Sequence, residues 1–324
     1  MIWPPRVGLL RSPSLSWQAT SALLGVDRVH LIDGGLGNQM FQHAYAIALQ
    51  KSDQARVRLD IGRYGKRSAH NGYEADRIFT LDGAIPALAR LASGITFRLA
   101  RRAADFNYEG PSIAFQPEFL RQGIKAYVKG FFPSYRYFQG AEAEVRRAFA
   151  FRLPLPERCA ALAEELAADD SVAVHVRRGD YVDAIHASTF AGICTPGYYA
   201  KAIALVRARR PAARFYFFSD EPDWCRATFA DVATKVVDGN VGTDAWADMA
   251  LMSRCRHAII ANSSFSWWAR WLGGFDGSIC VAPSRVLNPG EIFSRIEDFA
   301  PEQFAIVSPE GDVLRNLPCP APRS

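Results

Sequence analysis

Short apolar segments alternate with segments of helical spacing throughout the second half of the chain, and this alternation limits the possible folds more than any other feature. Strands are expected at 171–176, 214–218, 234–237, 257–261 and 279–282, and helices at 157–168, 197–209, 222–230, 244–254 and 265–272. Strands and helices repeated at these lengths are typical of a parallel, Rossmann-like sheet covered by helices on both faces. The sequence therefore predicts the α/β fold class.

The length of the chain and a pair of prolines predict two domains. A chain of 324 residues exceeds what one hydrophobic core usually organises. Leu153-Pro-Leu-Pro156 precedes a new helical pattern and is the best candidate for a linker. We therefore expect an N-terminal domain at 27–153 and a C-terminal domain at 157–316, with an irregular leader at 1–26 and an irregular tail at 317–324.

The overall composition is that of a soluble globular protein, with 49% hydrophobic and 22% charged residues. The excess of 38 basic over 33 acidic residues is too small and too dispersed to indicate a nucleic-acid partner. The chain contains no apolar run of about 18 residues, the length that spans a membrane. The 6 cysteines form no C-x-x-C pair and no metal-ligand spacing with histidine, which favours reduced, buried thiols in a cytosolic protein.

The apolar segment 172–176 ends abruptly in Arg177, Arg178, Gly179 and Asp180. Ligands of open α/β sheets bind at this edge, beyond the carboxyl ends of the strands. Two guanidiniums beside backbone amides freed by a glycine suit a phosphate or pyrophosphate. The alternative is a surface turn in which Asp180 neutralises one arginine. An adhesion role for Arg-Gly-Asp is disfavoured because the tripeptide directly follows a buried strand.

Two further strand ends are expected at the same edge. Ser219-Asp220-Glu221 ends one strand, and Asn262, Ser263 and Ser264 follow another at the start of a helix. Hydroxyls and backbone amides at a helix N-terminus can hold a phosphate, although an ordinary helix cap has the same sequence. Because this pattern and the arginines share one edge, we favour a phosphate site.

Asp248 lies in the helix before that last strand and has no basic residue at i+4. Such an acid can pair with a guanidine-like edge, such as that of guanine, or can simply be solvated. No Asp-x-Asp follows a strand. A divalent cation on the pyrophosphate is therefore not expected, and arginine would take its place.

The N-terminal half contains a second candidate ligand-binding turn. A strand at 29–32 runs into the glycine-rich turn 34–37 and a helix at 39–51, with Asn38 between them. Glycines let a backbone approach a ligand closely, although a tight turn with Asn38 as helix cap explains the same residues. A dinucleotide site that uses Asp60 has little support, because the turn is not G-x-G-x-x-G.

Two other segments have open interpretations. Residues 86–102 carry leucines at helical spacing with arginines between them, which suits a helix on a membrane surface or one packed on its own domain. Residues 127–138 are dense in aromatic side chains. These rings could line a sugar-binding groove, because sugars stack their apolar faces on aromatic rings, or could pack in the core.

Three segments together carry a family resemblance. Gly34-Gly-Leu-Gly-Asn-Gln-Met-Phe41, His175-Val-Arg-Arg-Gly-Asp-Tyr181 and the long segment Asp248–Trp268 resemble, in this order, the signature segments of the bacterial-type α-1,2-fucosyltransferases of glycosyltransferase family 11. The arginine-centred segment is shared with α-1,6- and protein O-fucosyltransferases, whereas the third points to the α-1,2 group.

The resemblance implies a GT-B architecture, in which two Rossmann-like domains with parallel sheets face each other across a cleft. It implies an inverting, metal-independent transfer of L-fucose from GDP-fucose to the 2-hydroxyl of a galactoside. No cofactor is expected. The C-terminal domain would hold the donor and the N-terminal domain the acceptor, a galactose-containing glycan or glycolipid such as an O-antigen intermediate.

The resemblance also implies roles for individual residues. Arg177 would bind the β-phosphate and stabilise the departing GDP, and Asp180 would orient the arginines, with Arg178 bracing Arg177 through Asp180. Asn38 would reach the pyrophosphate or fucose from the opposite domain. The expected catalytic residues are Arg177 and Asp180, and the expected donor site comprises Asn38, His175 near the nucleoside, Arg177, Arg178, Asp248 at the guanine edge, Asn262, and Ser263 and Ser264 at phosphate or ribose.

Several alternatives stay open at this point. The candidates for the general base are Asp33, Asp60, Glu74 and Asp76. A fucosyltransferase of another linkage, a non-catalytic nucleotide-sugar or glycan-binding protein and a nucleic-acid binder are the rival functions. The expected location is the bacterial cytoplasm, with peripheral contact at the inner membrane face through residues 86–102.

Overall fold

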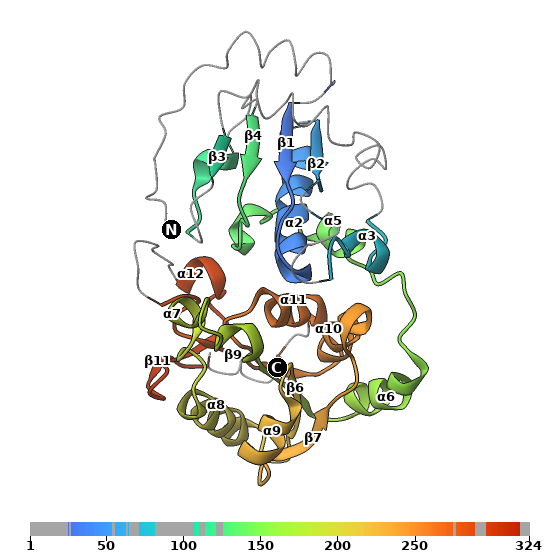
Figure 1. Cartoon of the computed structure of the whole chain (residues 1–324). Coiled ribbons are helices and arrows are strands. Elements are labelled where there is room, and N and C mark those ends of the chain that lie inside the picture. The colour runs from blue at the N-terminus through green and yellow to red at the C-terminus, as the bar shows by residue number, and fades with distance from the viewer. Residues whose placement is uncertain are drawn as a thin grey trace, which may run out of the picture. The chain divides into compact units, whose positions relative to one another are not determined.

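The computed structural model describes residues 25, 27–53, 56–62, 64, 71–81, 107–109, 114–120, 126–274, 277–288 and 296–317 (Figure 1). The chain divides into two compact units between Leu153 and Pro154, within the segment that the sequence marks as a linker. The segment 86–102, on which the membrane-contact hypothesis depends, lies outside the described residues. No helix in the described part of the chain is long and apolar enough to cross a membrane.

The first unit is built on a parallel sheet with the strand order β2-β1-β4-β3 (Figure 1). Its strands are β1 (Arg28–Leu31), β2 (Val57–Asp60), β3 (Asn107–Glu109) and β4 (Ala126–Lys129). Its helices are α2 (Leu36–Asp53), α3 (Ala75–Ile78), η2 (Pro117–Leu120), η3 (Tyr135–Tyr137) and α5 (Glu142–Ala148). Leu31 pairs with both Asp60 and Lys129, so three neighbouring strands end at one edge.

Helix α2 and the aromatic segment 127–138 form much of the core of this unit. Phe132 stacks on Tyr45 of α2 with ring centroids 4.0 Å apart. Tyr127, Phe132, Tyr137 and Phe138 are all buried. Core packing therefore explains most rings of this segment.

The second unit contains a sheet with the order β11-β10-β9-β8-β5-β6-β7, parallel except for β11. The strands are β5 (Ser171–Val176), β6 (Arg214–Ser219), β7 (Ala233–Val237), β8 (His257–Ile259), β9 (Cys280–Pro283), β10 (Ala305–Val307) and β11 (Val313–Arg315). The helices are η4 (Glu157–Cys159), α6 (Ala160–Ala168), η5 (Gly179–Tyr181), α7 (Ala187–Phe190), α8 (Pro196–Arg209), α9 (Pro222–Thr228), η6 (Gly242–Asp244), α10 (Trp246–Met252), α11 (Ser264–Gly273) and α12 (Ile296–Phe299).

The order of the strands reverses at β5. From β5 the chain adds β6 and β7 on one side, then crosses back to add β8, β9 and β10 on the other. In sheets of this kind a ligand binds beyond the carboxyl ends of the strands where the order reverses. The α/β class with two parallel-sheet, Rossmann-like domains is confirmed. The reversal predicts a ligand site at the residues that follow β5 and β8.

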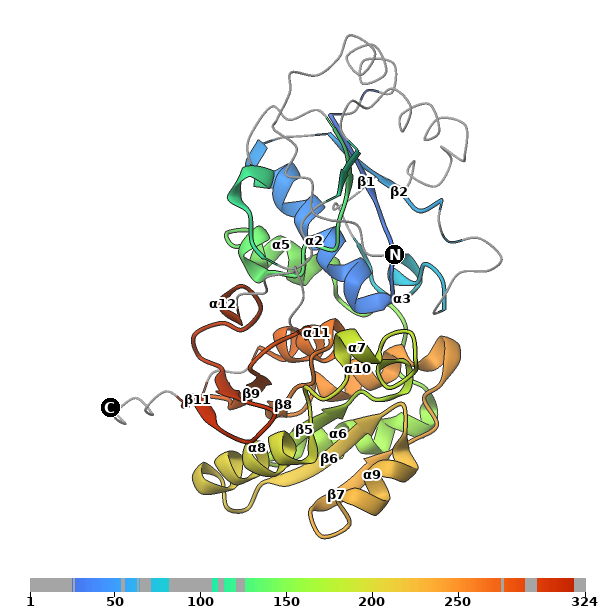
Figure 2. The same cartoon turned by 60° about the vertical axis from the view of Figure 1, so that its left-hand side comes forward.

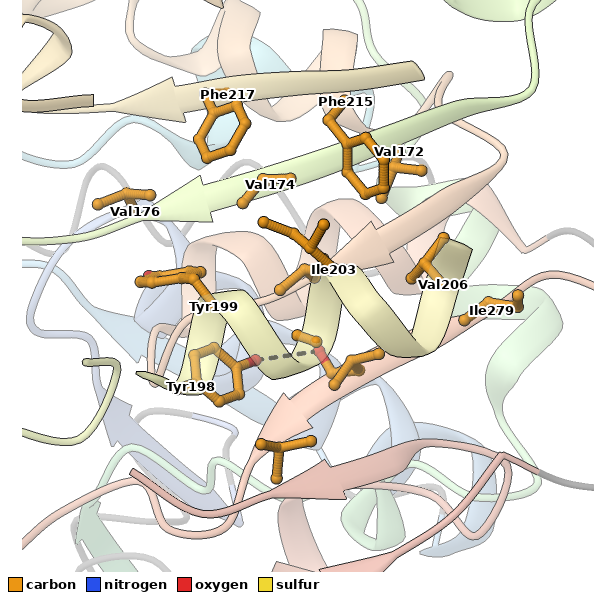
Figure 3. Close-up of a cluster of buried hydrophobic side chains, with 14 of the residues drawn as sticks. Val172, Val174, Val176, Tyr198, Tyr199, Ile203, Val206, Phe215, Phe217 and Ile279 are labelled. Atoms are coloured by element: carbon orange, nitrogen blue, oxygen red, sulfur yellow. Dashed lines mark hydrogen bonds between the residues drawn. The ribbon is translucent and has the colours of Figure 1, made fainter. Parts of the chain in front are cut away.

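Both faces of β5 are covered, which explains its uninterrupted apolar sequence. Val172, Val174 and Val176 face α8, which presents Val206, Ile203 and Tyr199 to them (Figure 3). His175, on the other face, lies with its ring centroid 5.9 Å from that of Phe265 in α11. Helices α10 and α11 pack against each other on this second face (Figure 2).

The described cysteines are free thiols, and Cys319 lies outside the described residues. Cys159, Cys225, Cys255 and Cys280 are buried and Cys194 is partly buried. This agrees with the expectation of reduced thiols.

Candidate active site

Arg177 lies directly after β5, at the reversal point, and two carboxylates hold its guanidinium. Its Nη2 is 2.6 Å from Oδ1 of Asp180, and its Nη1 is 3.1 Å from Oδ2 of Asp220, the residue that follows β6. The Arg177 side chain keeps 30% of its surface exposed. The guanidinium is therefore fixed in position and still accessible to a ligand.

Asp220 organises the turn as well as the guanidinium. Its Oδ1 accepts a hydrogen bond of 3.0 Å from the backbone N–H of Arg178. A Cβ atom at position 179 would lie 2.6 Å from Oδ2 of Asp220, so Gly179 is required by this close approach. The sequence predicts that Asp220 lies at the same edge but assigns it no role. The feature that could have identified it is an acidic residue directly after a strand that runs parallel to the arginine-bearing strand.

Arg178 has partners of its own, and the expectation that it braces Arg177 through Asp180 is wrong. Its Nε lies 2.9 Å from Oε2 of Glu221, and its guanidinium carbon lies 4.2 Å from the centre of the Trp224 ring. The backbone at Arg178 is not extended, with φ of −128° and ψ of −63°, and the two arginines have different ion-pair partners. Within the described residues, Asp180 forms its ion pair with Arg177, and Arg178 forms its ion pair with Glu221.

His175 is a buried, neutral imidazole behind the arginine. Burial and the nearby positive charge of Arg177 lower the pKa of His175 to about 3. Its Nδ1 is buried without a hydrogen-bond partner among the described residues. The ring packs on Phe265 of α11, close to the N-terminus of that helix.

The residues after β8 form a helix cap that is tied to the arginine turn. The Oγ of Ser263 accepts a hydrogen bond of 3.3 Å from the N–H of Phe265 and caps α11, which starts at Ser264. The hydroxyl of Tyr181 donates to the carbonyl oxygen of Asn262 at 3.1 Å. The two expected anion-binding patterns are thereby joined within one unit.

The Asn262 side chain supports this part of the fold. It is buried, and its Nδ2 donates to the carbonyl oxygens of Val286 at 3.1 Å and Phe190 at 3.4 Å. The amide is therefore engaged in holding two loops. A donor-binding role for Asn262 would have to use its backbone.

Asp248 in α10 is partly buried, so the solvated alternative is wrong. The Nδ2 of Asn240 donates to Oδ1 of Asp248 at 2.7 Å, and Arg158 donates to Oδ1 of Asn240 at 3.0 Å. Burial raises the pKa of Asp248 to about 7. Its charge is therefore adjustable near neutral pH, which suits a carboxylate that accepts hydrogen bonds from a ligand.

Asn38 belongs to the first unit, where it lies in the first turn of α2. Gly34 has a φ of +82°. A Cβ there would lie 2.7 Å from Nδ2 of Asn38 and 3.1 Å from Cε1 of Phe131. The glycine turn is therefore required by close packing, and Asn38 lies at the carboxyl edge of the sheet beside Phe131.

The candidates for the general base differ in their surroundings. Asp60 is buried and accepts hydrogen bonds from the Tyr127 hydroxyl at 2.5 Å and from the Gly62 N–H at 2.8 Å. Burial raises the pKa of Glu74, which pairs with Arg77 at 3.2 Å. Asp60 is therefore a structural residue.

Asp33 and Asp76, the remaining candidates for the general base, are both partly exposed. The Oδ1 of Asp33 accepts the Gly34 N–H at 2.9 Å. Among the described residues, no group of three or more His, Cys, Asp or Glu side chains is arranged to hold a metal ion.

Comparison with known proteins identifies relatives of known class. The model of glycosyl transferase family 11 matches residues 120–298. An alpha-1,2-colitosyltransferase from Escherichia coli is 31% identical over 78% of this chain and 89% of its own length. The O-antigen biosynthesis glycosyltransferase WbnK from Escherichia coli is 32% identical over 78% of this chain and 93% of its own length. A galactoside alpha-(1,2)-fucosyltransferase 1 from Ateles belzebuth is 28% identical over 75% of this chain and 64% of its own length.

The family match covers more than half of the chain and includes the arginine turn, Asp248 and the cap of α11. The two relatives from Escherichia coli each match over most of both chains. The protein is therefore a glycosyltransferase that belongs to glycosyl transferase family 11.

Proposed function

We propose that this protein transfers L-fucose from GDP-fucose to the 2-hydroxyl of a galactoside, with inversion and without a metal ion. The observation that carries the proposal is Arg177, fixed by Asp180 and Asp220 at the reversal point of the sheet. The relatives that are named for α-1,2 transfer of fucose and colitose support the linkage. The acceptor that we favour is a galactose-containing surface glycan, in line with the relative named for O-antigen biosynthesis.

Arg177 supplies the main electrostatic contribution in this proposal. As the bond between the sugar and the diphosphate breaks, negative charge grows on the departing GDP and positive charge on the sugar ring. A guanidinium has five N–H donors, and the two carboxylates leave donors available for phosphate oxygens. Because the guanidinium is already held in place, little reorganisation is needed at the moment of transfer.

The other named residues bind the donor. An ionised Asp248 would accept hydrogen bonds from the guanine edge, and neutral His175 would lie beside the nucleoside. The N-terminus of α11 would add its backbone amides to the phosphate site. Asn38 would reach the pyrophosphate or the fucose from the first unit.

Two measurements test the donor and the linkage. GDP-fucose should raise the thermal midpoint of the protein more than GDP-mannose or UDP-galactose, because a ligand of the native state stabilises it. Linkage analysis of the product should show fucose on the 2-hydroxyl of galactose. Equal shifts by all three nucleotide sugars would overturn the donor assignment, and a different linkage would overturn the regiochemistry.

Replacement of Arg177 tests the mechanism. Arg177→Ala should lower kcat about a hundredfold, which corresponds to about 3 kcal/mol of barrier. Arg226→Ala is a matched control, because Arg226 also bridges two carboxylates, Asp223 and Asp238, on the surface of the same unit. Wild-type turnover by the Arg177 variant would contradict the assignment.

Colitose is the second candidate for the transferred sugar, because one relative is an alpha-1,2-colitosyltransferase. Colitose is fucose without its 3-hydroxyl group. A site that hydrogen-bonds this hydroxyl rejects the deoxy sugar strongly, whereas an apolar site does not. The ratio of kcat/KM for GDP-fucose and GDP-colitose decides between the two donors.

A further inference from the structure

Phe131, which follows β4, is exposed to solvent, whereas the next ring in the sequence is buried. Phe131 keeps 40% of its surface exposed, whereas Phe132 keeps 3%. Phe131 follows β4 by two residues, and β4 pairs in parallel with β1, which leads into the turn at Gly34. The exposed ring therefore lies at the carboxyl edge of the first sheet, where ligands of parallel sheets bind.

The backbone that turns this ring outward is strained. Phe132 has a φ of +49°, in the left-handed region that residues other than glycine rarely adopt. Such a conformation is unfavourable for a residue with a side chain and persists only when the surroundings impose it.

The surroundings of Phe132 are a tight group of rings. Its ring centroid lies 4.0 Å from that of Tyr45, 5.1 Å from those of His30 and Tyr137, and 5.3 Å from that of Phe119. Core packing thus holds Phe132 in place and leaves Phe131 outside. Strained backbone of this kind concentrates at ligand-binding sites.

The exposed ring lies close to a polar side chain, that of Asn38. Both side chains lie close to Gly34. A Cβ atom at position 34 would be 3.1 Å from Cε1 of Phe131 and 2.7 Å from Nδ2 of Asn38. The hydroxyl of Tyr64 donates to the carbonyl oxygen of Gly34 at 2.7 Å and fixes the turn. An aromatic ring beside a carboxamide matches the two sides of a sugar, whose C–H groups stack on a ring while its hydroxyls bind polar groups.

We propose that Phe131 is the stacking platform for the acceptor sugar, a β-galactoside. In this sugar the axial 4-hydroxyl leaves the C–H groups at C3, C4 and C5 together on one face, which forms the apolar surface that an aromatic ring contacts. This inference rests on the proposed function, because it names the acceptor subsite of the same reaction. It assigns acceptor binding to the first unit, through a residue outside the family's arginine turn.

The kinetic test compares three substitutions. Phe131→Ala should raise the KM for the galactoside acceptor about tenfold and leave the KM for GDP-fucose unchanged, because only the acceptor loses its stacking partner. Phe131→Trp should retain the acceptor KM within about threefold, because the tryptophan ring also stacks. Leu314→Ala, at a side chain that is 63% exposed on β11, is the control for removal of an exposed apolar group and should change neither KM.

A binding measurement separates this inference from the proposed function. Saturation-transfer NMR with methyl β-galactoside in the presence of GDP should show the strongest saturation at H3, H4 and H5, and Phe131→Ala should abolish this pattern. If the wild type binds the galactoside in this way but transfers no sugar, the proposed function fails while the subsite stands. If Phe131→Ala binds and turns over like Leu314→Ala, or if Phe131→Trp loses as much as Phe131→Ala, the stacking role is wrong.

Discussion

Asp220 shows how one carboxylate can set the geometry of the guanidinium for which we propose a catalytic role. It contacts the guanidinium of Arg177 and the backbone of Arg178 and leaves no room for a side chain at Gly179. Its own negative charge opposes the binding of a diphosphate nearby. The benefit of Asp220 must therefore be alignment, which matters most when charge develops in the transition state.

Replacement of Asp220 tests whether this carboxylate aligns the guanidinium of Arg177. Asp220→Asn should lower kcat about tenfold while GDP binds as tightly as before or more tightly, because the guanidinium loses its alignment but the site loses a negative charge. Kinetics and calorimetry measure the two effects. Asp223→Asn, an exposed acid on α9, is the control. An unchanged kcat, or a loss of kcat together with a lower thermal midpoint, would show that Asp220 does not position Arg177.

The second prediction concerns the carboxyl of Asp248, whose pKa is raised to about 7. Hydrogen-bond acceptance from guanine requires the ionised form, so GDP affinity should increase about tenfold between pH 6 and pH 8. Calorimetry at several pH values measures the profile. Asp248→Asn removes this titration and controls for ionisation of the phosphate. A profile that is equally steep in the variant would exclude Asp248 from guanine recognition.

The raised pKa of Asp248 also affects the stability of the fold. As the pH rises, GDP affinity should increase, whereas the contribution of Asp248 to stability should decrease. A carboxyl with a folded pKa above its unfolded value of about 4 binds extra protons in the folded state between these pH values. Its stabilising contribution is complete below the unfolded pKa and is lost as the pH rises through 7. Asp248→Asn should therefore gain stability relative to the wild type as the pH rises from 5 to 8, as thermal unfolding at each pH can show.

At the scale of the element, two features favour glycine at position 34 in the turn between β1 and α2: a positive φ and close packing by neighbouring side chains. Gly34 and Gly140 have similar φ values, +82° and +89°, but only Gly34 has atoms packed against it. Gly34→Ala should lower the free energy of unfolding by more than about 1 kcal/mol, and by more than Gly140→Ala does. Urea unfolding measures both. Equal losses would mean that contact with Asn38 and Phe131 adds nothing beyond the backbone strain.

The sequence predicts elements well where the helical and strand periods are long. Strands β5 to β9 and helices α6, α8, α9, α10 and α11 match the expected segments and extend beyond them by at most one residue, because their apolar patterns are set by burial against the sheet. The short helix α7 between β5 and β6 was not expected. Strands β10 and β11 have only 3 residues each and were not expected. Strand β8 is equally short and was expected, so length alone does not explain why β10 and β11 were not. Pairing with a neighbouring strand decides the conformation of such short segments.

At the scale of the molecule, most of the expected donor site belongs to the second unit and Asn38 to the first. GDP-fucose should slow amide exchange at 176–181 and 262–266, because bound ligand suppresses local opening. If Asn38 reaches the donor, residues 34–42 should be protected as well. Hydrogen exchange with mass spectrometry measures both units in one experiment. Protection confined to the second unit would remove Asn38 from the donor site.

The sequence by itself determined the fold class, the position of the arginine turn and the family, because burial imposes a periodic pattern and because binding motifs are contiguous. It named Arg177 and Asp180, which contact each other three positions apart. Only the tertiary structure decided that Asp220 holds the same guanidinium, that Arg178 contacts Trp224, and that Phe131 is exposed beside the buried Phe132. These contacts join residues from different strands and helices, and the pairing of strands, which no local pattern records, brings them together.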